Sequence, residues 1–401
     1  MQLYGLRSKR NWGIGDFGDL LALVRLAATR GAALIGVNPL HATQGSPYSP
    51  SSRHALNFLY LDVEALPEYS ASAAARRLVA SAAFQRKLAQ LRRAPLVDYA
   101  GVAALKANVL GLTFRDAKPR AGKPSTFAIY EALRERYGGG WERWPREYRD
   151  PESRAVRKFA RRRARRVAYH DWVQARARAQ LDGVQRRAHE LGMPVGLYVD
   201  LALGADRGGA EVWADQESYA LEANCGAPPD EFNPKGQDWG WPPYSPRALR
   251  ASGYRPLREL LRANLPAGGA LRMDHVMALS RLYWIPRGAK PDRGGYVHYE
   301  VDDLLAVLGE ESRVCRCLVV GEDLGTVPAE LRAQLNQAGV LSYRPLYFEK
   351  TSDGELAPPS AYPRDALVCV STHDLPTWRG YWAEHDLDWR DKVGLTVDRA
   401  K

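Results

Sequence analysis

The sequence has few cysteines and no long apolar run. Its 401 residues include four cysteines, too few for a disulfide framework. The apolar stretch 20–26 is broken by Arg25, and no run approaches the roughly 18 residues that cross a bilayer. Residues 1–12 contain no apolar core of the kind found in signal peptides. We therefore expect a soluble, cytoplasmic protein with reduced thiols and no membrane partner.

Acidic residues are outnumbered by basic ones, 46 against 57, which gives a net charge of +11. Much of the excess lies between Arg134 and Arg187, and a basic face of this kind can bind nucleic acid. Apolar residues recur through the same stretch at helical spacing, however, so the arginines are predicted to face solvent. No RNA-recognition, zinc-finger or basic-zipper signature accompanies them. We therefore predict solvated helices and no nucleic-acid partner.

Short strand-like runs alternate with helical stretches along the chain. The runs are 33–37, 59–63, 195–199, 270–273, 317–320, 341–348 and 367–370. Several are almost continuously apolar, which is typical of parallel strands covered on both faces. This alternation predicts an α/β protein, a (β/α)8 TIM-type barrel whose site lies at the carboxyl ends of the strands.

Two segments interrupt the predicted barrel, which would span residues 1–401. Residues 65–190 are rich in Ala and Arg and almost free of strand signals, so we predict an inserted helical subdomain between the second and third strands. Residues 226–244 are rich in Pro, Gly and aromatic residues, and we predict an active-site loop there. The chain ends soon after the seventh strand, so the predicted barrel lacks its last strand–helix unit.

A glycine motif near the start fits a dinucleotide site only superficially. Gly13, Gly15 and Gly18 satisfy G-x-G-x-x-G and precede a helical stretch. A dinucleotide site also needs a strand directly before the motif and an acidic residue about 20 positions later, and neither is present. We interpret these glycines as turn residues and expect no cofactor.

Three carboxylates each follow a strand-like run. They are Asp274 in Arg-Met-Asp-His, Glu322 in Gly-Glu-Asp-Leu-Gly, and Asp374 in Thr-His-Asp-Leu-Pro. Arg272 and Asp274 lie two apart in a strand and should share a face, where the guanidinium favours the ionised carboxylate that a nucleophile requires. Partial burial at a strand end can give Glu322 the raised pKa of a general acid.

Each carboxylate taken alone also fits a helix cap or a surface position. The three together, on barrel-like units, fit carbohydrate chemistry. One carboxylate attacks the sugar, a second donates and then withdraws a proton, and a third charge stabilises the oxocarbenium-like state.

The motifs around these carboxylates resemble a known family. Arg272-x-Asp274, Gly321-Glu322-Asp323 and His373-Asp374 resemble the signature regions of the α-amylase clan. Further motifs resemble the 4-α-glucanotransferases of the amylomaltase type (disproportionating enzyme, glycoside hydrolase family 77), and they lie at 11–18, 46–48, 226–230, 236–240 and 321–328.

The resemblance implies a role for each site residue. Asp274 would be the nucleophile, Glu322 the acid/base and Asp374 the transition-state stabiliser. Arg272 and His373 would hold the donor sugar. The remaining substrate-binding positions are Tyr48, Asp200, Asp230, Gln237 and Trp239. Asp200 fits the clan's acidic position after the third strand better than Asp206 does, and the indole of Trp239 offers a sugar an apolar face.

The resemblance implies a glycosyltransferase that passes α-1,4-glucan segments between maltooligosaccharides with retention. The three carboxylates do not separate this activity from that of an α-glucan hydrolase of the same clan. A truncated glucan-binding fragment without activity is a further alternative. A metal-dependent hydrolase would use His275, Glu322, His373 and Asp374, but no His-x-His pair exists, so we expect no metal. The sequence does not predict the oligomeric state.

Overall fold

The computed structural model describes residues 1–43, 45–117, 122–230, 233–325, 327–373, 375–392 and 394. It divides the chain into two compact units, residues 1–318 and residues 319–401. Each unit contains its own set of parallel strands.

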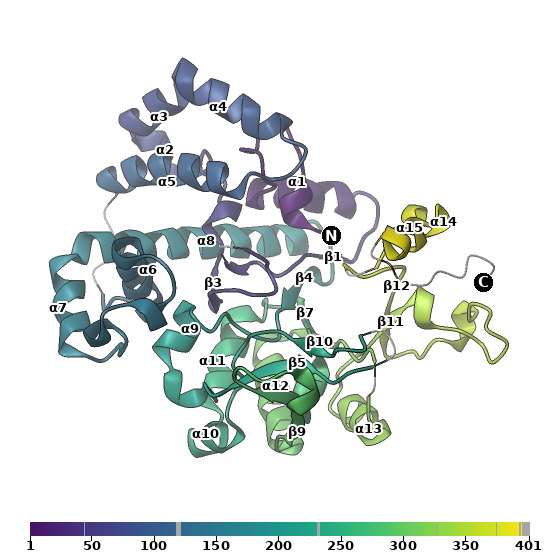
Figure 1. The fold of residues 1–401 in the computed structure, drawn as a ribbon. Helices are drawn as coiled ribbons and strands as arrows, with labels where there is room; N and C mark the ends of the chain where they lie inside the picture. Colours follow the sequence, from purple (N-terminus) through teal and green to yellow (C-terminus); the bar gives the residue numbers. More distant parts are fainter. Residues whose placement is uncertain are drawn as a thin grey trace. The chain divides into compact units, whose positions relative to one another are not determined.

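The first unit is built around the parallel strands β1 (Leu34–Gly36), β4 (Gly196–Leu201) and β7 (Ala270–Met273), paired in that order. Every residue of β4 and β7 is buried, as predicted for strands covered on both faces. The helices α1 (Phe17–Ala28) and α8 (Ala164–Glu190) pack together, and α8 also contacts β4 (Figure 1). The predicted α/β class is confirmed. Closure of the strands into a barrel stays a prediction.

Helices account for most of residues 65–190. They are α2 (Pro67–Ala71), α3 (Ala73–Ala80), α4 (Ala82–Arg93), α5 (Tyr99–Asp116), α6 (Thr126–Tyr137), α7 (Arg154–Arg162) and α8. Figure 1 shows α2 to α5 together above α8, and α6 and α7 near the left-hand end of α8. The described part of this stretch contains no strand. Its treatment as a separate subdomain stays a prediction.

The strand expected at 59–63 is wrong. Phe58–Tyr60 forms a single 3₁₀ turn, and side chains from the helices take the hydrogen bonds that a neighbouring strand would make. The buried ammonium of Lys106 on α5 donates to the carbonyls of Leu59 and Leu61, both at 2.6 Å. Gln180 on α8 bonds both the amide and the carbonyl of Asp62, at 2.9 and 2.8 Å. Side chains of the helices therefore satisfy this backbone where a strand was expected.

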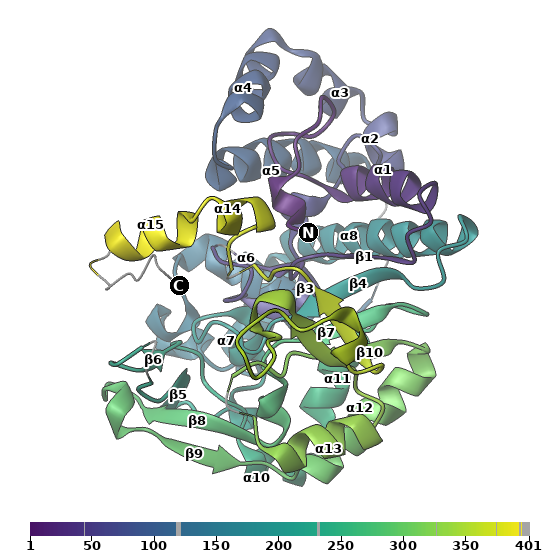
Figure 2. The same cartoon turned by 90° about the vertical axis from the view of Figure 1, so that its right-hand side faces the viewer.

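The first unit also contains an antiparallel strand pair and an antiparallel sheet, neither of which was predicted from the sequence. One is the pair β2 (His41–Ala42) and β3 (Ser52–Leu56). The other is a sheet in the order β6 (Gln237–Asp238), β5 (Ala223–Ala227), β8 (Arg281–Pro286) and β9 (Gly295–His298), shown at the lower left of Figure 2. Strands β5 and β6 lie partly inside the predicted 226–244 loop. The remaining helices of the unit are α9 (Ala210–Ala214), α10 (Pro246–Ala251), α11 (Arg255–Asn264) and α12 (Val301–Cys315).

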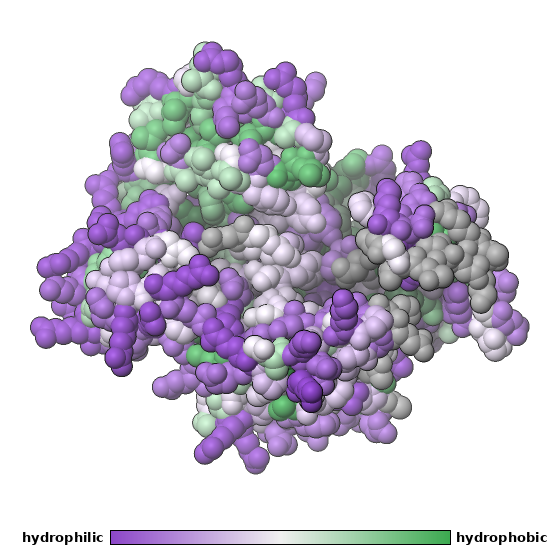
Figure 3. Space-filling view, viewed as in Figure 1, coloured by the Kyte–Doolittle hydropathy of each residue, from purple (hydrophilic) through white to green (hydrophobic). Residues whose placement is uncertain are grey.

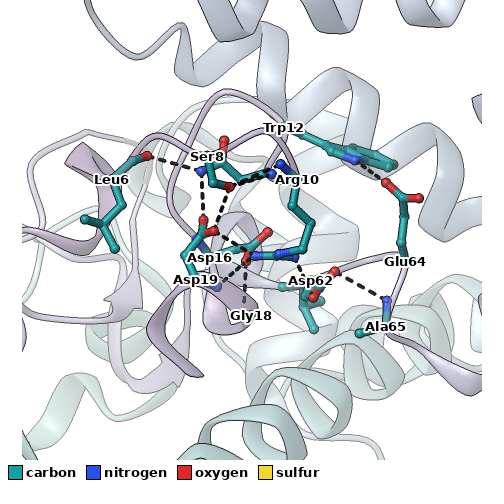
Figure 4. Close-up of polar contacts among 12 residues, drawn as sticks. Leu6, Ser8, Arg10, Trp12, Asp16, Gly18, Asp19, Asp62, Glu64 and Ala65 are labelled. Carbon is teal, nitrogen blue, oxygen red and sulfur yellow. Dashed lines mark hydrogen bonds and ion pairs between the residues drawn. The ribbon is translucent and has the colours of Figure 1, made fainter. Parts of the chain in front are cut away.

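The glycine motif is a structural turn, as predicted. Asp16 caps α1 by accepting hydrogen bonds from the amides of Gly18 and Asp19, and the Asp19 carboxylate accepts from the Asp16 amide in return. Arg10 forms ion pairs with Asp16, Asp19 and Asp62 (Figure 4). Arg10 thus links the beginning of α1 to Asp62, which follows the carbonyls that Lys106 binds.

The second unit begins within β10 (Leu318–Gly321), at Val319, and continues with α13 (Ala329–Gln337), β11 (Ser342–Pro345) and β12 (Ala366–Cys369). Val320 bridges to Leu341 in parallel, and β11 pairs with β12 in parallel. The three strands therefore share one carboxyl edge. Helices α14 (Trp378–Trp382) and α15 (His385–Lys392) follow.

Candidate active site

Arg272 joins two carboxylates at the carboxyl ends of β4 and β7. Strand register places it opposite Asp200. One of its terminal nitrogens, Nη1, lies 2.7 Å from Oδ1 of Asp200 and 2.9 Å from Oδ1 of Asp274. The side chain of Asp274 is 20% exposed, whereas those of Arg272 and Asp200 are about nine-tenths buried at 9% and 8% exposure. Asp274 is therefore the member of the group that an external molecule can reach.

Tyr48 completes the contacts of Asp200. Its hydroxyl donates to Oδ2 of Asp200 at 2.9 Å, so each carboxylate oxygen has a partner. Burial raises the pKa of Asp200, and the attraction of Arg272 opposes this. Burial and the Asp200 carboxylate raise the pKa of the Tyr48 hydroxyl, which keeps it a donor. Asp206, the alternative acidic residue, is exposed and accepts a hydrogen bond from the Gly208 amide.

Three aromatic rings, those of Trp239, Trp241 and His275, pack together, and His275 directly follows Asp274 in the chain. The ring of Trp239 meets that of His275 edge to face at 5.4 Å and lies 5.7 Å from the ring of Trp241. Its indole nitrogen donates to the side-chain oxygen of Gln237 at 3.2 Å. Strand β6 approaches β5 so closely at Gly226 that a Cβ there would lie 2.1 Å from the carbonyl oxygen of Gln237. Glycine is thus required to bring Gln237 and Trp239 to this place.

A buried ion pair fixes the backbone that follows Asp200. Arg53 on β3 donates through Nε and Nη2 to Glu211, at 3.0 and 2.6 Å, and through Nη1 to the Leu203 carbonyl at 2.6 Å. The hydroxyls of Tyr219 and Tyr244 also donate to Glu211, at 2.7 and 3.3 Å. The sequence analysis missed this group because Arg53 and Glu211 are far apart in the chain and belong to no motif.

His41 supports the same turn. Its Nε2 accepts a hydrogen bond at 3.2 Å from the amide of Ala202, two residues after Asp200. Complete burial lowers the pKa of His41 to about 3, so the ring stays neutral and can accept this hydrogen bond.

In the second unit, Glu322 and Asp323 follow β10 directly. Asp323 is 3% exposed and accepts hydrogen bonds from the Tyr343 amide at 3.0 Å and the Ser342 hydroxyl at 2.8 Å, both on β11. Arg332 also donates to it, at 3.3 Å. Glu322 accepts from the Leu324 amide at 3.0 Å and is 9% exposed. Asp323 therefore joins two strand ends, and Glu322 occupies the strand end itself.

The other candidates are placed as follows. His373 is exposed and follows β12, at the carboxyl edge shared with Glu322. Asp374 lies outside the described residues. Asp230 is exposed, and its carboxylate accepts from the Asn233 amide at 2.5 Å. The structure thus brings Tyr48, Asp200, Arg272 and Asp274 together, with Trp239 and Gln237 linked to them through His275.

Neither a metal centre nor a membrane span emerges from the described residues. In that part of the chain, no three His, Cys, Asp or Glu side chains are grouped as metal ligands. No helix there is both long and apolar enough to cross a bilayer. All four cysteines are free thiols.

Comparison with known proteins identifies the family. A sequence model of the 4-alpha-glucanotransferase family, glycoside hydrolase family 77, matches residues 1–400. A 4-alpha-glucanotransferase of Haemophilus influenzae is 38% identical over 98% of this chain and 61% of its own length. That of Mycobacterium bovis is also 38% identical, over 99% of this chain and 59% of its own. The chain thus spans about three-fifths of the length of these relatives.

Solved structures agree with the sequence relatives. The amylomaltase from Corynebacterium glutamicum superposes with a TM-score of 0.84 and 32% identity, covering 100% of this chain and 58% of that one. An amylomaltase from Streptococcus agalactiae in complex with acarbose, 20% identical, has the same fold with a TM-score of 0.79 over 97% of this chain and 83% of its own. From its sequence and its fold, the chain belongs to the 4-alpha-glucanotransferase family, glycoside hydrolase family 77.

Proposed function

We propose that the protein is a 4-alpha-glucanotransferase that moves α-1,4-glucan segments between maltooligosaccharides with retention of configuration. Family membership supports the reaction class. The observation that carries the assignment of residues is the Arg272 bridge, because it holds Asp274 beside a cation at the carboxyl end of a parallel strand. Arg272 would orient this carboxylate for attack on a sugar.

The proposed reaction has two steps. Glu322 protonates the glycosidic oxygen as Asp274 forms a bond to the anomeric carbon, and the shortened glucan leaves. Glu322 then takes the proton from the 4-hydroxyl of the acceptor, whose oxygen displaces Asp274. Asp374 would stabilise the positive charge that develops on the sugar in both transition states. No cofactor or metal is needed, because the proton and the leaving group are balanced within the cycle.

The remaining residues would hold the substrate. In this proposal Arg272, His373 and Asp200 bind the donor sugar, and Tyr48, Asp230 and Gln237 line the neighbouring subsites. Trp239 would stack on a glucose ring, since an indole presents an apolar face and a polar edge. The acarbose found in the amylomaltase from Streptococcus agalactiae supports a glucan-like ligand. The cytoplasmic location stays a prediction.

Product analysis after incubation with maltotriose tests the proposal. We expect glucose together with a ladder of maltooligosaccharides longer than the substrate. Glucose and maltose, with nothing longer, would instead establish the hydrolase. Oligosaccharide binding by a folded protein that forms no products would establish a binding protein. Asp274→Asn is the control for a contaminating activity, because it removes the proposed nucleophile.

A further inference from the structure

A hollow lined by arginines lies between α5 and the beginning of α8, and none of its lining residues belongs to the candidate active site. It encloses about 600 Å³, within the range of small-molecule sites. Five of its lining residues are Arg115, Arg162, Arg163, Arg165 and Arg166. In Figure 3, hydrophilic residues cover the surface that Figure 1 labels α7, next to this place.

The charges of this hollow are only partly balanced. Arg166 forms an ion pair with Glu135, which His170 also contacts at 3.1 Å. For the other four arginines, no ion pair is formed with any carboxylate among the described residues. Like charges gathered from three helices, α5, α7 and α8, repel one another. An anion bound among them would remove this cost.

The floor of the hollow is not charged. It includes Leu112 and Phe114 from α5 and Tyr169 from α8. The ring of Tyr169 lies 4.1 Å from the guanidinium carbon of Arg166 and packs edge to face on Phe114 at 5.6 Å. Because Nε and Nη2 of Arg166 already donate to Glu135, contact with an oxyanion falls to the other four arginines. The site therefore combines an aromatic floor with a cationic rim.

We propose that this hollow binds a small, multiply charged phosphate compound. Phosphate oxygens would pair with the guanidinium groups of Arg162, Arg163 and Arg165, and an attached ring or chain would lie against the Leu112 and Tyr169 side. Arginine forks match the geometry of phosphate better than other side chains do. The proposal does not depend on glucan transfer, because none of these residues belongs to the candidate active site.

Calorimetric titration with tripolyphosphate tests the site directly. The double variant R162A/R165A should bind tripolyphosphate at least tenfold more weakly than the unchanged chain. The matched control is R86A/R186A, which removes the same charge from exposed positions on α4 and α8 and should bind within twofold of the unchanged chain. Absence of binding by the unchanged chain, or equal weakening in both variants, would overturn the proposal.

A second titration separates the possible sources of the phosphate. Adenosine triphosphate binding more tightly than tripolyphosphate supports a ligand whose ring occupies the floor, and equal affinity supports an inorganic polyphosphate in the same site. A single-stranded oligonucleotide that binds more tightly than both, and whose binding R162A/R165A also weakens, would overturn the proposal in favour of a nucleic-acid surface.

Discussion

The carboxylates of the two units can be compared pair by pair. In the first unit Asp200 is held through both oxygens by Arg272 and Tyr48, while its neighbour Asp274 is reachable from outside. In the second unit Asp323 joins β10 to β11, while Glu322 occupies the end of β10. In each unit, a carboxylate that positions the backbone or a cation thus accompanies a carboxylate that is proposed to react.

The largest effect is expected from replacing Asp274. Asp274→Asn keeps a hydrogen-bond acceptor for Arg272 but removes the negative charge that attacks the sugar. We expect the rate of maltotriose conversion to fall about 10⁴-fold, each tenfold corresponding to about 1.4 kcal/mol of barrier. The melting temperature should stay close to that of the unchanged chain. Activity near the original level would refute the role of Asp274.

The second unit allows a matched pair of variants. Glu322→Gln should lower kcat about a thousandfold by removing the proton donor, with little change in stability. Asp323→Asn should instead destabilise the fold by about 2 kcal/mol, because a buried acceptor of several hydrogen bonds loses its charge. Steady-state kinetics and urea unfolding measure the two effects. If Asp323→Asn abolished activity at unchanged stability, the roles would be reversed.

A third carboxylate, Glu211, extends the comparison to a residue proposed only to position others. Glu211→Gln leaves Arg53 buried without its ion-pair partner, which costs about 3 to 5 kcal/mol. The double variant Arg53→Met/Glu211→Gln should recover part of this loss, as urea unfolding can show. A loss in the double variant equal to the sum of the two single losses would mean that the pair is not coupled.

A last prediction concerns the dependence of stability on pH, and it has no effect at neutral pH. The pKa of His41 is lowered from 6.5 to about 3 by burial, so between these values the unfolded chain binds a proton that the folded chain does not. Stability contributed by neutral His41 is therefore complete above pH 6.5 and is lost as the pH falls toward 3. His41→Asn should flatten the pH dependence of the urea midpoint in this window. An unchanged slope would show that other groups control it.

Much of the strand framework could be predicted from the sequence. The runs at 33–37, 195–199, 270–273, 317–320 and 367–370 each coincide with a strand to within about two residues, because short apolar runs, most of which contain β-branched residues, favour strands. The Arg272–Asp274 contact also followed from strand periodicity.

The parts of the fold and of the site that the sequence did not predict depend on contacts between distant residues. The apolar run at 59–63 has the composition of a strand, but the side chain of Lys106 satisfies its carbonyls. The difference between Glu322 and Asp323 arises from β11, which lies about twenty residues later. Arg53 and Glu211 form their ion pair although 158 positions separate them in the sequence. No local pattern contains this information.

The hydrogen bonds from Lys106 and Gln180 to the backbone of residues 59–62 affect whether the helical stretch can be removed from the chain. A helical insertion is usually regarded as an addition that can be removed from its host. Here the host backbone at Leu59, Leu61 and Asp62 has its polar groups satisfied by the insertion itself. Without residues 65–190, these backbone groups would lose the side-chain partners that satisfy them. We therefore predict that the helical stretch 65–190 and the backbone at residues 59–62 unfold together.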